Sequence, residues 1–466
     1  MAFTQRLEGR NLLLVAFALV ISLVIGVAAG VQPRYGVAAA LGLAFAGAVL
    51  ADLTVGVILF TVLSYLDVVK AGSGAVSFIK LAGLIVFLSW FAAQATRSRH
   101  GRDSRSLLAA SPMLSAGVVA FVAWSAISVV WAVNSGTAFS STYRLLLDVL
   151  LLPIVFGAVR RREHVVWVVA AFVVGAVASA MIGLLQSGGA RVAGGIGDFD
   201  GEAALLVPAM TLGVGLIAAL PRGSAWRSLV VLGELIMGAG LLNTGSRGGI
   251  VALATVLVAA VLFGGRWRGR AAGIAVLVAV LVPFYVVALA PSGAVQHLSS
   301  GSSTGRTDLW RVGLKMWSSN PVGGVGSGNF ANAAVQYVES SGPLSRADII
   351  VDVPHVAHNT YLEILDELGV PGLLAFLTIA IASVASALRA ARLYERAGDR
   401  TFELMSRSVA LALLALLSAD FFITNEYEHL LWVLLALPPA LLAVARSETR
   451  AEPSLERSAV PDGGAR

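Results

Sequence analysis

Two histidines, His355 and His358, stand three residues apart in the stretch HVAHNTYLEILDELGVPG at 355–372, in a chain with only six histidines. Imidazole has an ordinary pKa of about 6.5, so it exchanges protons near neutral pH. The residues that follow predict a short helix with Thr360 as N-cap and Glu363 returning to it in a capping box. The positive end of that helix disfavours imidazolium, so we expect His358 to be neutral and able to accept a proton.

The predicted helix has one apolar face and one acidic face. We expect it to lie on the membrane surface, with Glu363, Asp366 and Glu367 on the face away from the apolar residues, and to end at Gly369. A capping or packing role for the histidines remains open. A zinc site is disfavoured, because zincin-like helices space their ligands at i and i+4 with a glutamate between, and no third histidine or cysteine lies nearby.

Two arginines have glycine-rich surroundings, Arg191 in SGGARVAGGIG and Arg247 in NTGSRGG. Glycines let a ligand approach the backbone closely, and the guanidinium group offers a fixed fork of donors that suits phosphate oxygens. Either arginine alone is also explained by contact with lipid headgroups or by a loop salt bridge. Together they suggest a diphosphate site.

The composition places these residues in a membrane protein. Hydrophobic residues make up 57% of the chain and charged residues 13%, and the mean hydropathy is +0.83. Crossing a bilayer takes about 20 apolar residues in a helix. Such runs recur along the chain, without the weaker alternating pattern of an outer-membrane barrel. We therefore expect an all-α integral membrane protein, a polytopic helical bundle. Without cysteine, the chain has no disulfide and no thiolate metal site.

The apolar runs predict fourteen transmembrane helices. The first run ends in small residues that resemble a signal-peptidase site, but its length fits a retained helix better. The second and third runs are short and are parted only by Asp52, so twelve spans is the alternative. The expected spans lie near 11–31, 36–51, 53–69, 77–95, 113–132, 142–159, 163–186, 202–220, 228–242, 249–264, 271–290, 371–388, 403–423 and 429–446.

Arginines fall in every second loop, which predicts the orientation, because short cytoplasmic loops retain Lys and Arg. The N-terminus and the C-terminus are then cytoplasmic. The net charge of +6 needs no nucleic-acid partner, since the topology accounts for most of the arginines. The loops assigned to the cytoplasm carry their arginines at 97–105, 160–162, 222–227, 266–270 and 389–400.

This orientation divides the chain into four parts. The segment after the eleventh expected span is the only large soluble piece and is expected to be one large extracytoplasmic loop with short helices. Its stretch GRTDLWRVGLKMW has helical spacing, and its tryptophans, Trp310 and Trp317, suit either sugar stacking or the membrane interface. The expected parts are a transmembrane bundle at 1–290, the extracytoplasmic loop at 291–357, an interfacial helix with C-terminal transmembrane helices at 358–446, and a disordered cytoplasmic tail at 447–466.

Four motifs in order carry a family resemblance: ARVAGGIGDFD, LLNTGSRGGIVAL, GRTDLWRVGLKMWSSNPVGGVGSGNF and HNTYLEILDELGVPGLLAFL. Over roughly residues 180–390 the chain resembles the O-antigen ligase and O-antigen polymerase superfamily. The resemblance implies a multi-pass glycosyltransferase of the C-type class in the bacterial inner membrane. Its donor is an oligosaccharide linked to a polyprenyl diphosphate, and its acceptor is a hydroxyl of a glycan or glycolipid on the extracytoplasmic face. It implies no metal and no cofactor.

The motif match assigns roles to individual residues. Arg191 and Arg247 would hold the diphosphate, Arg306 would be a further contact to donor or acceptor, and His358 would be the general base, with His355 beside it at the substrate. The chain departs from the family pattern after the first arginine, where relatives commonly carry an asparagine and this sequence reads DFDGEA.

Two questions of function remain open at this point. The motifs do not separate a ligase from a surface polysaccharide polymerase, which differ in the acceptor. A membrane transporter or a flippase of lipid-linked sugars is the alternative from another class. Such proteins place ionisable residues and broken helices near the membrane midplane, often in two related halves. We detect no internal repeat, and the candidate arginines lie at one surface.

Overall fold

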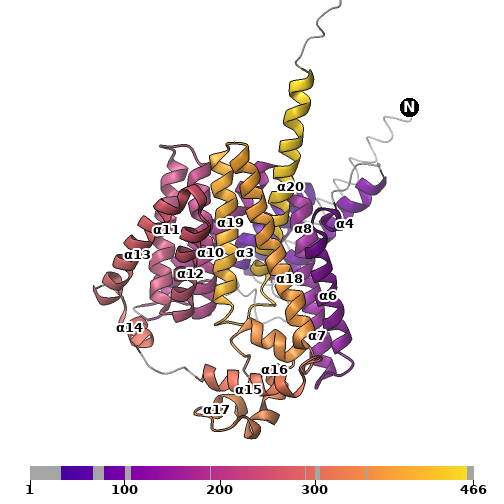
Figure 1. Ribbon diagram of the computed structural model, residues 1–466, viewed down its shortest axis with the longest axis vertical. Coiled ribbons are helices and arrows are strands. Elements are labelled where there is room, and N and C mark those ends of the chain that lie inside the picture. The colour runs from indigo at the N-terminus through magenta and orange to yellow at the C-terminus, as the bar shows by residue number, and fades with distance from the viewer. Residues whose placement is uncertain are drawn as a thin grey trace, which may run out of the picture. The chain divides into compact units, whose positions relative to one another are not determined.

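Helices form the fold throughout the described part of the chain, where no strand occurs (Figure 1). The computed structural model describes residues 33–66, 78–99, 106–188, 190–288, 290–299, 305–352 and 355–458. The chain divides into two units, Met1–Phe60 with Val69–Arg102 and Thr61–Val68 with Asp103–Arg466. Each unit is described by itself.

The first unit contains helices α2 (Pro33–Ala51) and α4 (Phe78–Arg99) and the start of α3 (Leu53–Ser64). The Asp52 carboxylate accepts a hydrogen bond from the Thr54 amide (2.7 Å), which explains why α3 begins there. Ser89 Oγ donates to the Val49 carbonyl (2.9 Å) and joins α4 to α2. The span expected at 11–31 lies outside the described residues.

The second unit contains most of the apolar helices. Their lengths follow the apolar runs, and capping side chains mark several starts: Asp198, Ser224, Ser246 and Asp399 each accept a hydrogen bond from an amide in the first turn. The helices are α5 (Leu107–Ala110), α6 (Pro112–Ser128), α7 (Ser135–Val149), α8 (Leu151–Ala158), α9 (Arg162–Gln186), α10 (Phe199–Ala219), α11 (Ala225–Thr244), α12 (Arg247–Phe263), η1 (Gly265–Trp267), α13 (Arg268–Ala288), α18 (Thr360–Arg396), α19 (Arg400–Ala419) and α20 (His429–Ser458).

The helix lengths confirm a polytopic helical membrane protein. Among the described residues, eight helices are long and apolar enough to cross a membrane, and five shorter apolar helices accompany them. Every span expected from the sequence within the described ranges overlaps a helix. The expected total of twelve to fourteen spans includes the shorter helices and the 11–31 span, and it stays a prediction.

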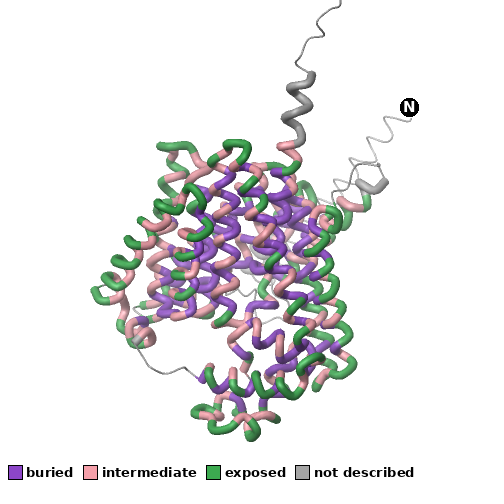
Figure 2. Tube along the Cα trace, in the orientation of Figure 1, coloured by how far each residue is buried: buried purple, intermediate pink, exposed green. Residues whose placement is uncertain are grey.

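Close packing of small residues holds the bundle of the second unit together. Gly215 of α10 lies against Ser408 and Met405 of α19, and Gly240 of α11 lies against Ala180 of α9. Such contacts let helix backbones approach closely where lipid offers no hydrophobic driving force. Helix α20 is the most enclosed span of this bundle, and burial concentrates along α10, α19 and α20 (Figure 2).

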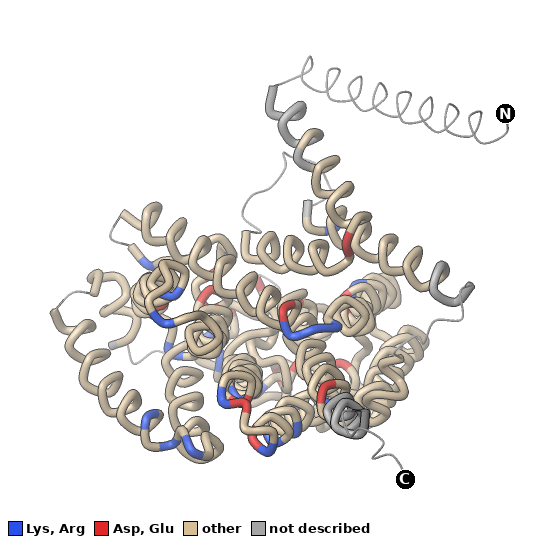
Figure 3. Tube along the Cα trace, turned by 90° about the horizontal axis from the view of Figure 1, so that it is seen from above, with Lys and Arg blue, Asp and Glu red and all other residues tan. Residues whose placement is uncertain are grey.

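Arginine-rich loops that the sequence assigned to one side of the membrane meet at one end of this unit. Arg162 bonds to Asp399 (2.6 Å) and to Glu448 (2.7 Å), and Arg266 pairs with Glu403 (3.0 Å). These five residues come from four different loops or helix ends. The sequence assigned all four to the same side of the membrane, and their contacts here agree with that assignment. Charges are sparse along the helices themselves (Figure 3).

The segment between α13 and α18 forms a small helical layer at the opposite end from the C-terminal part of α20 (Figure 1). The helix expected in GRTDLWRVGLKMW is present as α15 (Arg306–Ser319). Its apolar side, with Leu309, Val312 and Met316, packs on Phe330 and Ile350 in a buried cluster. The other elements are α14 (Ser292–Ser299), α16 (Phe330–Ala334), η2 (Val335–Tyr337), η3 (Glu339–Ser341) and α17 (Asp348–Val351).

The start of α18 differs from the capping box expected at Thr360. Asn359 is the N-cap, and its side chain accepts from the amides of Tyr361 and Leu362 (both 3.1 Å). Thr360 turns its hydroxyl to the Ile423 carbonyl (2.8 Å) instead. Asparagine is a better N-cap residue than threonine, which agrees with a cap one residue earlier than expected.

The acidic face of α18 is buried against the protein, whereas the position of this helix on the membrane surface stays a prediction. Glu363, Asp366 and Glu367 are at most 3% exposed. Glu367 accepts from the amides of Gly328 (2.5 Å) and Phe330 (3.0 Å). The glycine-rich stretch NPVGGVGSGNF therefore packs on this face of α18 as a chain of turns. Its main-chain amides donate hydrogen bonds to Glu367, which compensates for the burial of that carboxylate.

Two glycines allow this contact. Gly324 and Gly369 both have left-handed backbone angles (φ 65° and 66°), and a Cβ on either would meet main-chain atoms of the other segment. Gly369 also kinks α18, which confirms the break expected there.

The C-terminal helix is longer than expected. Helix α20 continues to Ser458, so residues 447–458 are helical where the sequence suggested a disordered tail, and 459–466 lie outside the described residues.

Replacing Glu367 by alanine should destabilise the protein, because two buried amides would lose their acceptor, a loss of about 2–4 kcal/mol. Glu367→Gln keeps a carbonyl acceptor and should cost less. Thermal unfolding of the detergent-solubilised chain measures both, with Glu339→Ala, an exposed carboxylate of the same segment, as control. Equal melting temperatures for the two alanine variants would contradict this assignment.

Candidate functional site

Four separate stretches of the second unit meet at the end of the bundle that carries α14 and α15. They are the loop between α9 and α10, the junction of α11 and α12, the start of α15, and the segment before α18. The Val192 amide donates to the Asn243 carbonyl (3.0 Å), which lays the first stretch on the second. Asp200 and Arg306 join the first stretch to the third (2.5 Å).

Arg191 is held at the centre of this end. Its Nε donates to the Thr244 carbonyl (2.6 Å), and its guanidinium lies over the Phe199 ring, 4.3 Å from the centroid. Burial lowers the pKa of Arg191, while Asp200 and Asp198 act in the opposite direction. Its Nη2 is buried and has no hydrogen-bond partner among the described residues. A buried cationic donor in this position suits an anionic oxygen that comes from a ligand.

Asp200 joins three of the stretches. Its carboxylate accepts from Ser246 Oγ (2.6 Å) and from Arg306 Nη2 (2.5 Å). The position in the first turn of α10 favours a negative charge through the helix dipole. The DFDGEA stretch, where the sequence departs from the family pattern, thus supplies the group that arranges the surrounding donors.

Arg247 is the first residue of α12 and follows the N-cap Ser246. Its Nη2 donates to the main-chain carbonyl of His297 (2.8 Å), and the His297 ring contacts the Gly245 carbonyl (3.1 Å). The side chain is thus directed towards α14, beside the N-terminus of α12. Helix N-termini with cationic side chains attract anions.

His358 has a strained backbone. It is the only residue other than glycine with a positive φ (50°) in the described part of the chain. The residue before it is fixed at both ends: Glu363 accepts from the Ala357 amide (2.9 Å), and Trp310 Nε1 donates to the Ala357 carbonyl (3.1 Å). With Asn359 capping α18, the neighbours impose this conformation, as is common for functional residues.

The His358 ring is half-buried, and its environment lowers its pKa. Burial lowers its pKa first, the positive charge of Arg306 lowers it further, and Asp198 and Asp200 oppose the shift. The His355 ring lies 6.5 Å away, centroid to centroid. The expectation of a neutral imidazole is in agreement with this environment.

The structure therefore brings four of the five expected site residues around one acidic pair. Asp198 and Asp200 act electrostatically on both Arg191 and His358. His355 and Arg306 adjoin His358, and Arg247 adjoins the group through Ser246 and turns towards His297. Among the described residues, no three His, Asp or Glu side chains are placed to hold a metal ion.

Sequence reasoning missed several members of this group. Ser246 is recognisable as a helix cap before Arg247. Asp200 stood out only as part of a departure from the family pattern, and Asp198 was not singled out. The role of Trp310 as a donor to the backbone before His358, and the contact of Arg247 with His297, depend on segments far apart in the sequence and have no local signal.

Comparison with known proteins finds a family model that matches part of the chain. Residues 232–377 match the family model described as O-antigen ligase, a stretch that includes Arg247, Arg306, His355 and His358 but not Arg191. The match supports the assignment to the O-antigen ligase and polymerase superfamily. No curated protein matches the chain.

Removing the positive charge of Arg306 should raise the pKa of His358, because that charge disfavours imidazolium. In Arg306→Gln, the midpoint of the pH-dependent reaction of His358 with diethyl pyrocarbonate, followed by mass spectrometry, should move to higher pH. Arg311→Gln, which changes an exposed arginine of the same helix, should leave it in place. An unchanged or lower midpoint in Arg306→Gln would contradict the described electrostatics.

Proposed function

We propose that this member of the O-antigen ligase and polymerase superfamily is a glycosyltransferase that moves a glycan from a polyprenyl-diphosphate carrier to an acceptor hydroxyl. The observation that carries the proposal is that two groups lie around the same two aspartates: the half-buried guanidinium of Arg191, whose Nη2 has no hydrogen-bond partner among the described residues, and the imidazole of His358, whose pKa is lowered. The guanidinium group can donate to a phosphate oxygen, and the imidazole can accept the proton of a hydroxyl group.

The arginines are proposed to bind the diphosphate. Arg191 Nη2 offers a donor, and Arg247 stands at a helix N-terminus close by. Arg306 forms an ion pair with Asp200 and serves as a further contact to donor or acceptor. A diphosphate leaves readily once its charge is balanced, so guanidinium groups fill the part that a divalent cation plays elsewhere.

The transfer step then requires a base. The acceptor oxygen forms a bond to the anomeric carbon while the bond from that carbon to the diphosphate oxygen breaks. The carrier diphosphate departs with the electron pair, and the hydroxyl proton goes to His358. A neutral imidazole is suited to this because general-base catalysis is most effective when the base is free near the working pH. His355 is proposed to contact the substrate beside it.

The acceptor divides the proposal into two forms. A ligase would use a glycolipid or another anchored glycan, and a surface polysaccharide polymerase would use a second carrier-linked unit. Both place the site on the extracytoplasmic face of the bacterial plasma membrane, with both termini in the cytoplasm. A transporter or flippase is less well supported, because the site gathers at one end of the bundle rather than at its middle.

Alanine at Arg191, Arg247 or His358 should each lower the transfer rate by about a hundredfold or more, since each removes a group used in the transition state. The assay follows transfer from a purified polyprenyl-diphosphate oligosaccharide in the presence of EDTA. Arg346→Ala, an exposed arginine of the same end, should keep wild-type activity. Full activity in all three site variants would exclude the proposed roles.

Sidedness can be tested because the chain contains no cysteine. A single cysteine at Ser340, exposed in the segment before α18, should react with a membrane-impermeant maleimide added to intact cells. A cysteine at Ala397, exposed between α18 and α19, should react only after the membrane is opened. The reverse pattern would place the site in the cytoplasm and refute the proposal.

A further inference from the structure

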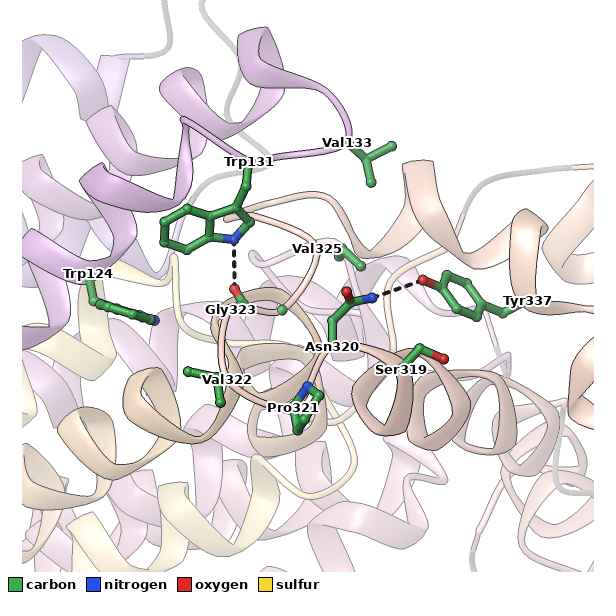
Figure 4. A pocket seen from close by; sticks show the side chains of 11 residues that line it. Trp124, Trp131, Val133, Ser319, Asn320, Pro321, Val322, Gly323, Val325 and Tyr337 are labelled. Carbon is green, nitrogen blue, oxygen red and sulfur yellow. Dashed lines mark hydrogen bonds between the residues drawn. The ribbon is translucent and has the colours of Figure 1, made fainter.

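A cavity of about 740 Å³ lies apart from the candidate site, where the end of α6 faces the glycine-rich turns after α15. This volume falls within the range of about 300–1,000 Å³ found for small-molecule sites. Figure 4 shows Trp124 and Trp131 on one side, Tyr337 on the other, and Asn320 between them.

The two indole rings are fixed in place. Trp131 Nε1 donates to the Gly323 carbonyl (3.0 Å), and Trp124 Nε1 donates to the Leu368 carbonyl (2.7 Å). The ring centroids lie 5.5 Å apart at an angle of 57°. Because both indole N–H groups already donate hydrogen bonds, only the faces of the rings are available to contact a ligand in the cavity. The Trp131 side is accessible, since this residue is 38% exposed.

The polar groups of the cavity are neutral. The Asn320 amide nitrogen donates to the Tyr337 hydroxyl oxygen (3.1 Å), which orients both groups. Within the described residues this leaves the Asn320 carbonyl oxygen and the Tyr337 hydroxyl proton for a ligand. No described side chain lining the cavity is charged, so a phosphate group has no partner among them. Fixed aromatic faces beside neutral donors and acceptors match a sugar, which has apolar C–H faces and hydroxyl edges.

The cavity is connected to His358 through α18. Trp124 donates a hydrogen bond to the Leu368 carbonyl, and α18 begins at Thr360, shortly after His358. From Thr360 to Leu368 the helix axis advances by roughly 12 Å, at about 1.5 Å per residue. This separation corresponds to a short oligosaccharide rather than to one sugar ring. A glycan with its reacting end at His358 can therefore reach the cavity with a unit further along.

We propose that the cavity lined by Trp124, Trp131, Asn320 and Tyr337 is a saccharide subsite, which binds an uncharged sugar unit remote from the reacting bond. The inference rests on the proposed function. It deepens that function by assigning a place in the fold to a sugar unit remote from the reacting bond.

The test uses the full chain in lipid nanodiscs and the glycan released by mild acid from the lipid-linked pool of the producing strain. Saturation-transfer NMR measures its binding. Trp131→Ala should weaken binding about tenfold, the effect of one lost aromatic contact. Trp131→Phe keeps a ring without the N–H and should bind within about threefold of wild type. Trp226→Ala, which removes an exposed tryptophan at the start of α11, is the control.

Transfer kinetics identify which glycan occupies the subsite. Trp131→Ala should raise KM and leave kcat unchanged for the substrate, donor or acceptor, whose glycan binds here. It should have no effect when that substrate carries only a single sugar. Equal binding by Trp131→Ala and wild type would overturn the inference, as would equal losses in Trp131→Ala and Trp131→Phe, which would indicate a structural role of the N–H bond.

A separate variant distinguishes this failure from failure of the proposed function. His358→Ala should lose transfer and still bind the released glycan like wild type. If His358→Ala transfers normally, the proposed base is wrong, and the subsite is then judged by the binding measurements alone.

Discussion

The arrangement of the site depends on the carboxylate of Asp200, because this group joins three parts of the chain that lie far apart in the sequence. It accepts from Ser246 at the start of α12 and from Arg306 at the start of α15. Arg191 and His358 both lie within its electrostatic reach. A group of arginines at a partly buried membrane end would otherwise repel one another. One acidic side chain in the first turn of α10 lets them gather and still leaves donors for a ligand.

The first section of α18 has a second organising role. At its start, Asn359 and Glu363 fix the backbone on both sides of His358 and impose the left-handed conformation there. At its end, Glu367 holds the glycine-rich turns, and the Leu368 carbonyl fixes the Trp124 ring. One rigid helical stretch thus sets the distance between the proposed base and the aromatic cavity. Two of the buried acids of this helix position neighbouring segments rather than face water: Glu367 holds the turns, and Glu363 holds the residue before His358.

The features that depend on local sequence were predictable, and those that depend on distant partners were not. Apolar runs located the helices, and three of the arginine-rich loops, at 160–162, 266–270 and 389–400, meet at one end as expected. A lowered pKa of His358 was expected from its place before a helix, but in the structure its causes are burial and the charge of Arg306, which lies far away in the sequence. The acidic face of α18 looked solvated because periodicity shows that a face is polar but not what covers it. Asp200 and Arg306 lie 106 residues apart, and Trp131 shares no motif with the cavity residues that it faces.

The central claim is that the grouped arginines hold a lipid-linked diphosphate within reach of His358. It is tested most directly by an experimental structure of the full chain with a polyprenyl diphosphate bound. The account predicts phosphate oxygens within hydrogen-bond distance of Arg191 Nη2 and of the Arg247 guanidinium, with the His358 ring facing the leaving oxygen across the site. A diphosphate bound at the opposite end, among the ion pairs of Arg162 and Arg266, would contradict it.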